Sequence, residues 1–142
     1  SSRFTIATHM LIIIAIKGQE SKVTSDFLAA SVGVNPVIIR KTLSQLKKAG
    51  LISVARGTGG TEIIKDLQDI SLFDVYQAVE CLGKSGKLFS FHDNPKPNCP
   101  VGANIHKVLD QKLLDIQVAM ENQLRQMSLD QVVADAEARI AK

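Results

Sequence analysis

Apolar residues recur at helical spacing in several segments of the chain, and turn-forming residues separate these segments. Residues 3–17 have the apolar content of a buried helix, although the β-branched run 12–14 would also suit a strand. A second helix is expected to begin at Thr24 or Ser25, since either hydroxyl can accept a hydrogen bond from its first turn. Gly33 is expected to end it.

A third helix is predicted directly after this turn. Asn35 is a favourable N-cap and Pro36 a favourable first helical residue, and Gly50 provides a stop signal. The pattern therefore predicts two helices joined by a tight turn. At about 100° per residue, the buried side of the third helix is formed by Ile39, Leu43 and Leu46.

The net charge of +3 is unevenly distributed along the chain. Residues 27–61 contain no Asp or Glu and carry +5, whereas the remaining residues carry 12 basic and 14 acidic side chains. A local excess of this kind indicates a binding surface for a polyanion, and the alternative is an ordinary solvated face. The basic residues of the window are Arg40, Lys41, Lys47, Lys48 and Arg56.

The face of the third helix opposite its apolar side is narrow and basic. A helix of this kind fits the major groove of DNA, where its first turns reach base edges and its later residues meet phosphates. We expect Arg40 and Lys41 to contact base edges or phosphates. Lys47 and Lys48 are expected to contact phosphates or to complement the helix dipole.

A β-hairpin is predicted after this helix. Residues 51–55 and 61–65 have strand character, and the glycine-rich sequence RGTGG lies between them. In this wing, Arg56 would be placed to enter a narrow minor groove, whereas the alternative is an ordinary hairpin loop. A nucleotide-binding loop is disfavoured because no GK[ST] sequence follows and the glycines do not open a helix.

A long helix is predicted from Val101 to Met127, with a continuous apolar stripe. Such a helix would be roughly 40 Å long, more than a compact domain of this size can cover, so a second copy is the expected partner. Packing against the first helix is the alternative. The predicted dimerisation residues are Ile105, Leu109, Leu113, Ile116, Met120, Leu124 and Met127.

Three sequence segments, taken in this order, resemble the Rrf-type winged-helix transcription regulators: LAASVGVNPVIIRKTLSQLKKAGLISVARGTGG, ISLFDVYQAVE and SLDQVV. The similarity covers nearly the whole chain and is closest to a cluster-free branch resembling YwnA. It implies a mainly α fold, with a winged helix-turn-helix domain, a two-stranded wing and a long C-terminal dimerisation helix. The predicted division is residues 3–82 for the DNA-binding domain, 83–99 for a loop or sensor segment, and 100–142 for the dimerisation and C-terminal helices.

The resemblance implies a homodimer on a partly palindromic double-stranded DNA operator, with the third helix in the major groove and the Arg56 wing against the minor groove. Thr61 departs from the family, in which many members have a glycine or an aromatic residue at this position. The expected DNA-binding residues are Thr24, Ser25, Asn35, Pro36, Val37, Arg40, Lys41, Ser44, Lys47, Lys48, Arg56, Gly57 and Gly59.

The sensory chemistry of the family is only partly matched. Members with an iron–sulfur cluster carry three cysteines before the long helix, whereas this chain has Cys99 alone there, and position 102, where the family has a histidine ligand, is glycine. No iron–sulfur cluster or other cofactor is therefore expected. Two roles are open for Cys99: a redox sensor, for which a helix start and Lys96 are expected to lower the pKa of the thiol, and a capping or packing residue.

The remaining candidate chemistry is weak. Cys81 ends an apolar stripe and is expected in the core, and the spacing of His92, Cys99 and His106 matches no standard metal-ligand set. No nucleophile elbow or orienting acid supports a cysteine enzyme, so an enzyme is not expected. The apolar run 10–16 is too short to span a bilayer, and a cytoplasmic protein is expected.

The sequence predicts a sequence-specific DNA-binding transcription regulator, with a repressor expected. The alternative is a winged-helix module whose basic helix binds an acidic protein. Preference for one duplex over scrambled DNA would separate the two, because both interactions depend on salt. Neither the operator nor the effector is indicated by the sequence.

Overall fold

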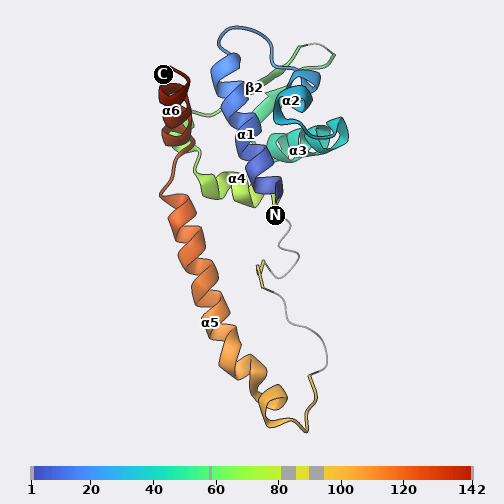
Figure 1. The fold of residues 1–142 in the computed structure, drawn as a ribbon, viewed down its shortest axis with the longest axis vertical. Helices are drawn as coiled ribbons and strands as arrows, with labels where there is room; N and C mark the ends of the chain where they lie inside the picture. Colours follow the sequence, from blue (N-terminus) through green and yellow to red (C-terminus); the bar gives the residue numbers. More distant parts are fainter. Residues whose placement is uncertain (1, 58, 81–85, 90–94, 142) are drawn as a thin grey trace. The chain divides into compact units, whose positions relative to one another are not determined.

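The computed structural model describes residues 2–57, 59–80, 86–89 and 95–141, which form parts of two compact units. The first unit combines residues 1–80 with residues 124–142, and the second comprises residues 81–123. The element labels are those of Figure 1. The first unit contains α1 (Ser2–Lys17), α2 (Ser25–Val32), α3 (Pro36–Lys48), β1 (Ile52–Val54), β2 (Thr61–Ile63), a 3-10 turn η1 (Leu67–Asp69), α4 (Leu72–Val79) and α6 (Leu129–Ile140).

Helix α1 forms the centre of the first unit's core and packs against α2, α3, α4, α6 and β2. Its buried residues are Ala7, Met10, Leu11 and Ile14, which follow the helical spacing of three, one and three residues. A strand would divide these side chains between two faces, whereas the helix places all of them on one. Burial therefore outweighs the strand propensity of the β-branched run, and the predicted helix is confirmed.

The turn between α2 and α3 is built as the sequence predicts. Of the two possible caps of α2, Thr24 is the one used, since its Oγ1 accepts a 3.1 Å hydrogen bond from the N–H of Phe27. Gly33 ends α2 with φ = 77°, a backbone conformation that favours glycine. Asn35 caps α3 by accepting a 2.8 Å hydrogen bond from the N–H of Val37, and Pro36 is the first helical residue.

Strands β1 and β2 form the predicted antiparallel hairpin, with Ser53 opposite Glu62. Each strand has three residues, fewer than the five predicted. A backbone hydrogen bond flanks the ladder at each end, from the Ala55 N–H to the Gly60 carbonyl (2.9 Å) and from the Ile64 N–H to the Leu51 carbonyl (3.1 Å). Gly60 has φ = 83° and lies against the backbone of Val23, where an added Cβ would be 3.2 Å from backbone atoms. The hairpin is thereby held close to the residues that precede α2.

Helix α6 belongs to the core of the first unit. Its Leu129 and Val133 are buried, and the N–H of Leu129 donates a 2.7 Å hydrogen bond to the carbonyl of Ile70. The N–H of Leu72 in turn donates to the carbonyl of Met127 (2.8 Å). Long-range backbone pairing thus joins α6 to the segment before α4 within the first unit. The predicted division of the chain into functional domains stays a prediction.

Helix α5 (Pro100–Arg125) has 26 residues and a length of about 39 Å, as the periodicity predicts. Met127, the last position of the predicted stripe, lies beyond the end of the helix, in the connection to α6, and its part in dimerisation stays a prediction. Ser128 starts α6 with a capping box, and this new helix start interrupts the spacing. The predictions for Cys81 and His92 concern residues outside the described ranges.

Within the described ranges, no helix combines the length and the apolar character that crossing a bilayer requires.

Candidate nucleic-acid interface

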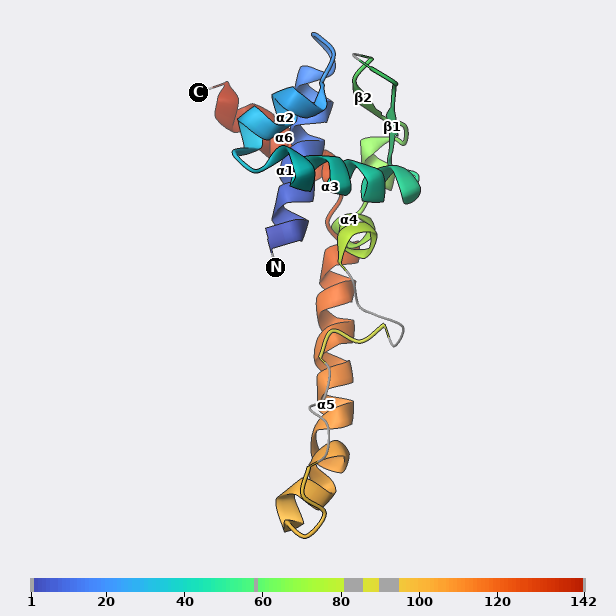
Figure 2. The ribbon, with the colours of Figure 1, turned by 90° about the vertical axis from the view of Figure 1, so that its right-hand side faces the viewer.

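Helix α3 divides cleanly into a buried and an exposed side. Ile39, Leu43 and Leu46 belong to the core, and Thr42 is also buried, with its hydroxyl donating to the carbonyl of Ile38 (2.8 Å). Figure 2 shows α3 in side view, with the β1–β2 hairpin beside its C-terminal end. The predicted outward residues are all exposed: Val37, Arg40, Lys41, Ser44, Lys47 and Lys48.

The exposed side of α3 is strongly basic, because the helix contains four cations and no acidic residue. Lys47 and Lys48 lie in its last turn, where cations also interact favourably with the helix dipole. Arg40 and Lys41 lie nearer the start of the helix. The positive charge of this surface would attract the phosphate backbone of DNA. Arg40 and Lys41 are the cations closer to the N-terminal turns, which read bases in helix-turn-helix proteins.

The first turn of α3 presents apolar as well as polar groups. The Oδ1 of Asn35 is engaged in the cap, and the side chain of Val37 is exposed, with an exposed fraction of 61%. The sequence reasoning missed two further exposed apolar residues, Ile38 and Phe27. The helical wheel could have indicated Ile38, which neighbours the outward face, whereas the exposure of Phe27 depends on how α2 packs.

One of the two predicted contacts at the start of α2, Thr24, has a structural role. Thr24 and Ser25 are both half-buried, and the hydroxyl of Thr24 accepts the capping hydrogen bond of α2. In helix-turn-helix proteins, the first helix crosses the DNA backbone while the second enters the groove. Contact between these residues and DNA stays a prediction.

The wing presents Arg56 to solvent at the end of β1. Gly57 follows with φ = 67°, and a Cβ added at Gly59 would collide with the Cβ of Ala55. The positive φ of Gly57 favours glycine, and the close approach at Gly59 leaves no space for a side chain, so both residues shape the backbone near Arg56. Contact between these glycines and DNA stays a prediction.

Cys99 is an exposed residue directly before the first residue of α5. Backbone hydrogen bonds from Gly102 and Val101 to its sulfur lower the pKa of the thiol from its ordinary value of 9.0. The helix start therefore acts in the predicted direction. The charge of Lys96 is not among the causes; this residue contacts Cys99 through its carbonyl, which accepts the Cys99 N–H at 3.2 Å.

The surroundings of Cys99 do not fit an iron–sulfur cluster held by three cysteines, because the whole chain has only two. A Cβ at Gly102 would lie 2.8 Å from the carbonyl oxygen of Lys96, so the backbone there leaves no room for a histidine. Across the ranges that the structure covers, no group of three or more His, Cys, Asp or Glu residues is arranged to hold a metal.

Helix α5 carries apolar side chains on more than one side. Of the predicted stripe, Ile105, Leu109, Leu113, Met120 and Leu124 are half-buried and Ile116 is 54% exposed. Val101 and Val108, which the stripe omitted, are 69% and 50% exposed. At about 100° per residue, these two valines lie within about 80° of Ile116. We call the set Val101, Ile105, Val108 and Ile116 the open face of α5.

The fold and the α3 surface together define a winged helix-turn-helix protein with a basic, outward-facing second helix. The chain belongs to the Rrf2 family, described as iron-dependent transcriptional regulators, whose profile matches residues 1–135. It is accordingly a DNA-binding transcription regulator and not an enzyme.

The similarity to individual relatives extends over most of the chain. YwnA of Bacillus subtilis (strain 168), named as a candidate HTH-type transcriptional regulator, is 41% identical over 133 residues, which cover 94% of this chain and 96% of YwnA. The crystal structure of a candidate DNA-binding protein matches with a TM-score of 0.72 and 37% identity, covering 92% of this chain and 98% of that one. The structure of T. potens IscR matches at 21% identity and a TM-score of 0.69, and the match covers 98% of this chain and 88% of that one. This similarity supports the fold.

Proposed function

We propose that this regulator acts in the cytoplasm as a homodimer that represses transcription by occupying a partly palindromic operator. The observation that carries the proposal is the exposed, acid-free face of α3, whose cations and first-turn residues suit a major groove. Occupancy of an operator blocks polymerase without a further contact surface, and this favours a repressor over an activator.

The open face of α5 supports the homodimer. Val101, Val108 and Ile116 are each at least half exposed, and a soluble regulator gains by burying such a set. A two-fold axis would cover the same face on both copies at once. It would also present two copies of α3 to successive major grooves, as a palindromic operator requires.

Cys99 suits a thiol switch in this regulator. Its exposure and lowered pKa favour a reactive thiolate, whereas a capping role at the start of α5 uses the same hydrogen bonds. The two roles differ in one result. If oxidant releases operator DNA from the wild type and equally from Cys99→Ser, Cys99 is not the switch.

Selection of DNA from random duplexes by the purified chain tests the operator proposal. We expect one partly palindromic sequence to be enriched and to retain binding in excess scrambled competitor, because a specific complex is typically about 10³-fold or more tighter than a non-specific one. Equal competition by scrambled DNA would overturn the proposal. It would favour the alternative, in which the basic helix binds an acidic protein.

A further inference from the structure

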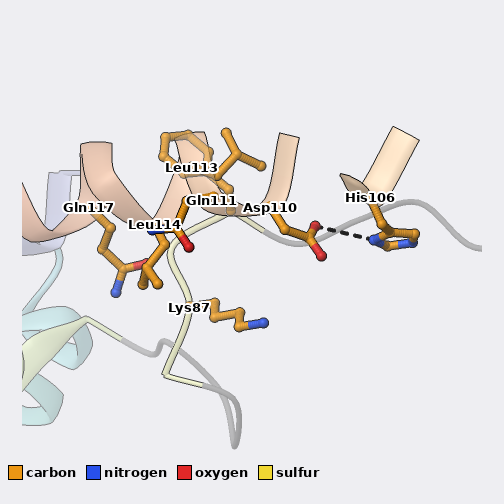
Figure 3. A pocket seen from close by; sticks show the side chains of 8 residues that line it. Lys87, His106, Asp110, Gln111, Leu113, Leu114 and Gln117 are labelled. Atoms are coloured by element: carbon orange, nitrogen blue, oxygen red, sulfur yellow. Dashed lines mark hydrogen bonds and ion pairs between the residues drawn. The ribbon is translucent and has the colours of Figure 1, made fainter. Parts of the chain in front are cut away.

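The cavity along α5 has a volume of about 410 Å³, and Figure 3 shows it beside the segment that contains Lys87. Its lining includes groups of both signs, the Lys87 ammonium and the Asp110 carboxylate. Such a lining favours no single class of ligand. The first turn of α3 is chemically more selective, because its exposed side chains are hydrocarbon.

The backbone N–H groups at the start of α3 are already engaged. Pro36 has no N–H, and the N–H of Val37 donates to the Oδ1 of Asn35 at 2.8 Å. The N–H of Ile38 donates to the carbonyl of Asn35 at 2.9 Å. A helix start binds a phosphate through N–H groups of this kind, so these three residues do not provide the donors for such a contact.

The side chains of the same turn are apolar and exposed. Val37 and Ile38 have exposed fractions of 61% and 43%. One exposed apolar residue is ordinary on a protein surface, but Val37 has a particular position. At about 100° per residue, it lies about 60° from Arg40 on one side and about 40° from Lys41 on the other. Val37 is therefore at the centre of the basic face, whereas Ile38 lies about 160° from Arg40, at its edge.

We propose that Val37 reads the C5-methyl group of a thymine in the operator half-site. This inference rests on the proposed function, in which α3 enters the major groove. Among the groups that the four bases present there, the apolar one is the thymine methyl. Contact between Val37 and this methyl removes hydrocarbon from water on both sides. Against the other bases, Val37 would cover a polar edge without a hydrogen bond, which is unfavourable.

The charges around Val37 favour DNA over an apolar protein as the group that covers it. A protein that buried Val37 would also bury Arg40 and Lys41, whereas DNA supplies phosphates close to its bases. Val37 and Arg40 are about 4.5 Å apart along the helix axis, and successive base pairs are about 3.4 Å apart along the duplex. We therefore expect the thymine within about two base pairs of the Arg40 contact.

Uracil substitution in the selected operator tests the inference, since uracil is thymine without the C5-methyl group. Each thymine is replaced in turn, and the affinity of the full chain for each duplex is measured. We expect one position at which uracil weakens binding about fourfold for each half-site substituted, the effect of one buried methyl group. With Val37→Ala, the same uracil should change the affinity less than about twofold, even in both half-sites, because the shortened side chain no longer reaches the methyl.

Ile38→Ala is the matched control, because it shortens an exposed apolar residue of the same turn at the edge of the basic face. It should keep the full uracil effect. The inference would be overturned, while the operator proposal stands, by a half-site without thymine, by the absence of a uracil-sensitive position, or by an equal uracil effect in the wild type and Val37→Ala. Failure to select any duplex would instead contradict the proposed function, and the inference with it.

Discussion

Thr61 and Val23 are joined by two hydrogen bonds to one carbonyl oxygen. The backbone N–H of Thr61 donates to the Val23 oxygen at 2.9 Å, and the Thr61 hydroxyl donates to the same atom at 3.0 Å. The side chain of Thr61 is buried, with 4% exposure. The Thr61 hydroxyl therefore adds a second hydrogen bond between the wing and the residues before α2.

Thr61→Val should lower the free energy of unfolding by about 1 kcal/mol, because it removes one buried hydrogen bond while keeping the shape of the side chain. Chemical denaturation measures the change. Thr61→Ser is the control, since it keeps the hydroxyl and loses only a methyl group. A valine variant as stable as the wild type would show that the backbone hydrogen bond alone holds the wing.

Arg40→Ala and Lys48→Ala should affect DNA binding in different ways. If Arg40 reads a base edge, its loss costs about 1–3 kcal/mol on the selected operator and reduces the preference over scrambled DNA. Loss of Lys48 should weaken binding to all duplexes similarly. It should also reduce the slope of log K against log salt concentration by about one, because one phosphate contact is lost. Competition binding at several salt concentrations measures both effects. Indistinguishable behaviour of the two variants would refute this division of roles.

Ile116→Lys should favour the monomer, because a charge would have to be buried at the proposed dimer interface. Val118→Lys is the matched control, since Val118 is 44% exposed and lies about 160° from Ile116 and 140° from Ile105 on the helical wheel. Sedimentation at micromolar concentration should give a dimer for the wild type and the control, and monomer for Ile116→Lys. A monomeric wild type would contradict the homodimer itself.

Cys99 should be alkylated by iodoacetamide faster than an ordinary thiol near neutral pH. The lowered pKa means that the thiolate, the reactive form, is populated at lower pH, so the rate should rise with a midpoint below 9.0. The rate is measured in a Cys81→Ser background, which leaves one thiol. A midpoint at or above 9.0 would show that the hydrogen bonds from Gly102 and Val101 do not stabilise the thiolate in solution.

The features that the sequence predicts well are local ones. Gly33, Asn35 and Pro36 act within a few residues of their positions, and they fix the turn and the start of α3 wherever the rest of the chain lies. The outward face of α3 follows from the same periodicity, since Ile39 and Leu46 must be buried. These signals were enough to predict the helix-turn-helix and the exposure of its basic residues.

The features that the sequence did not reveal depend on distant contacts. The burial of Gln117 comes from backbone groups 29 and 31 residues away, and the hydrogen bond from Leu129 to Ile70 brings α6 into the core. The end of the apolar stripe of α5 did have a local signal, because Ser128 and Gln131 form a capping box that starts α6. It could have shown that Met127 lies outside α5.

The central claim is that α3 enters the major groove while a second copy does the same one helical repeat away, and hydroxyl-radical footprinting on the selected operator tests it most directly. We predict two protected segments on one face of the duplex, related by the operator dyad and separated by about 10 base pairs between centres. The double substitution Arg40→Ala and Lys41→Ala should abolish protection of both segments. A single protected segment, or a two-segment pattern that survives this double substitution, would contradict the claim.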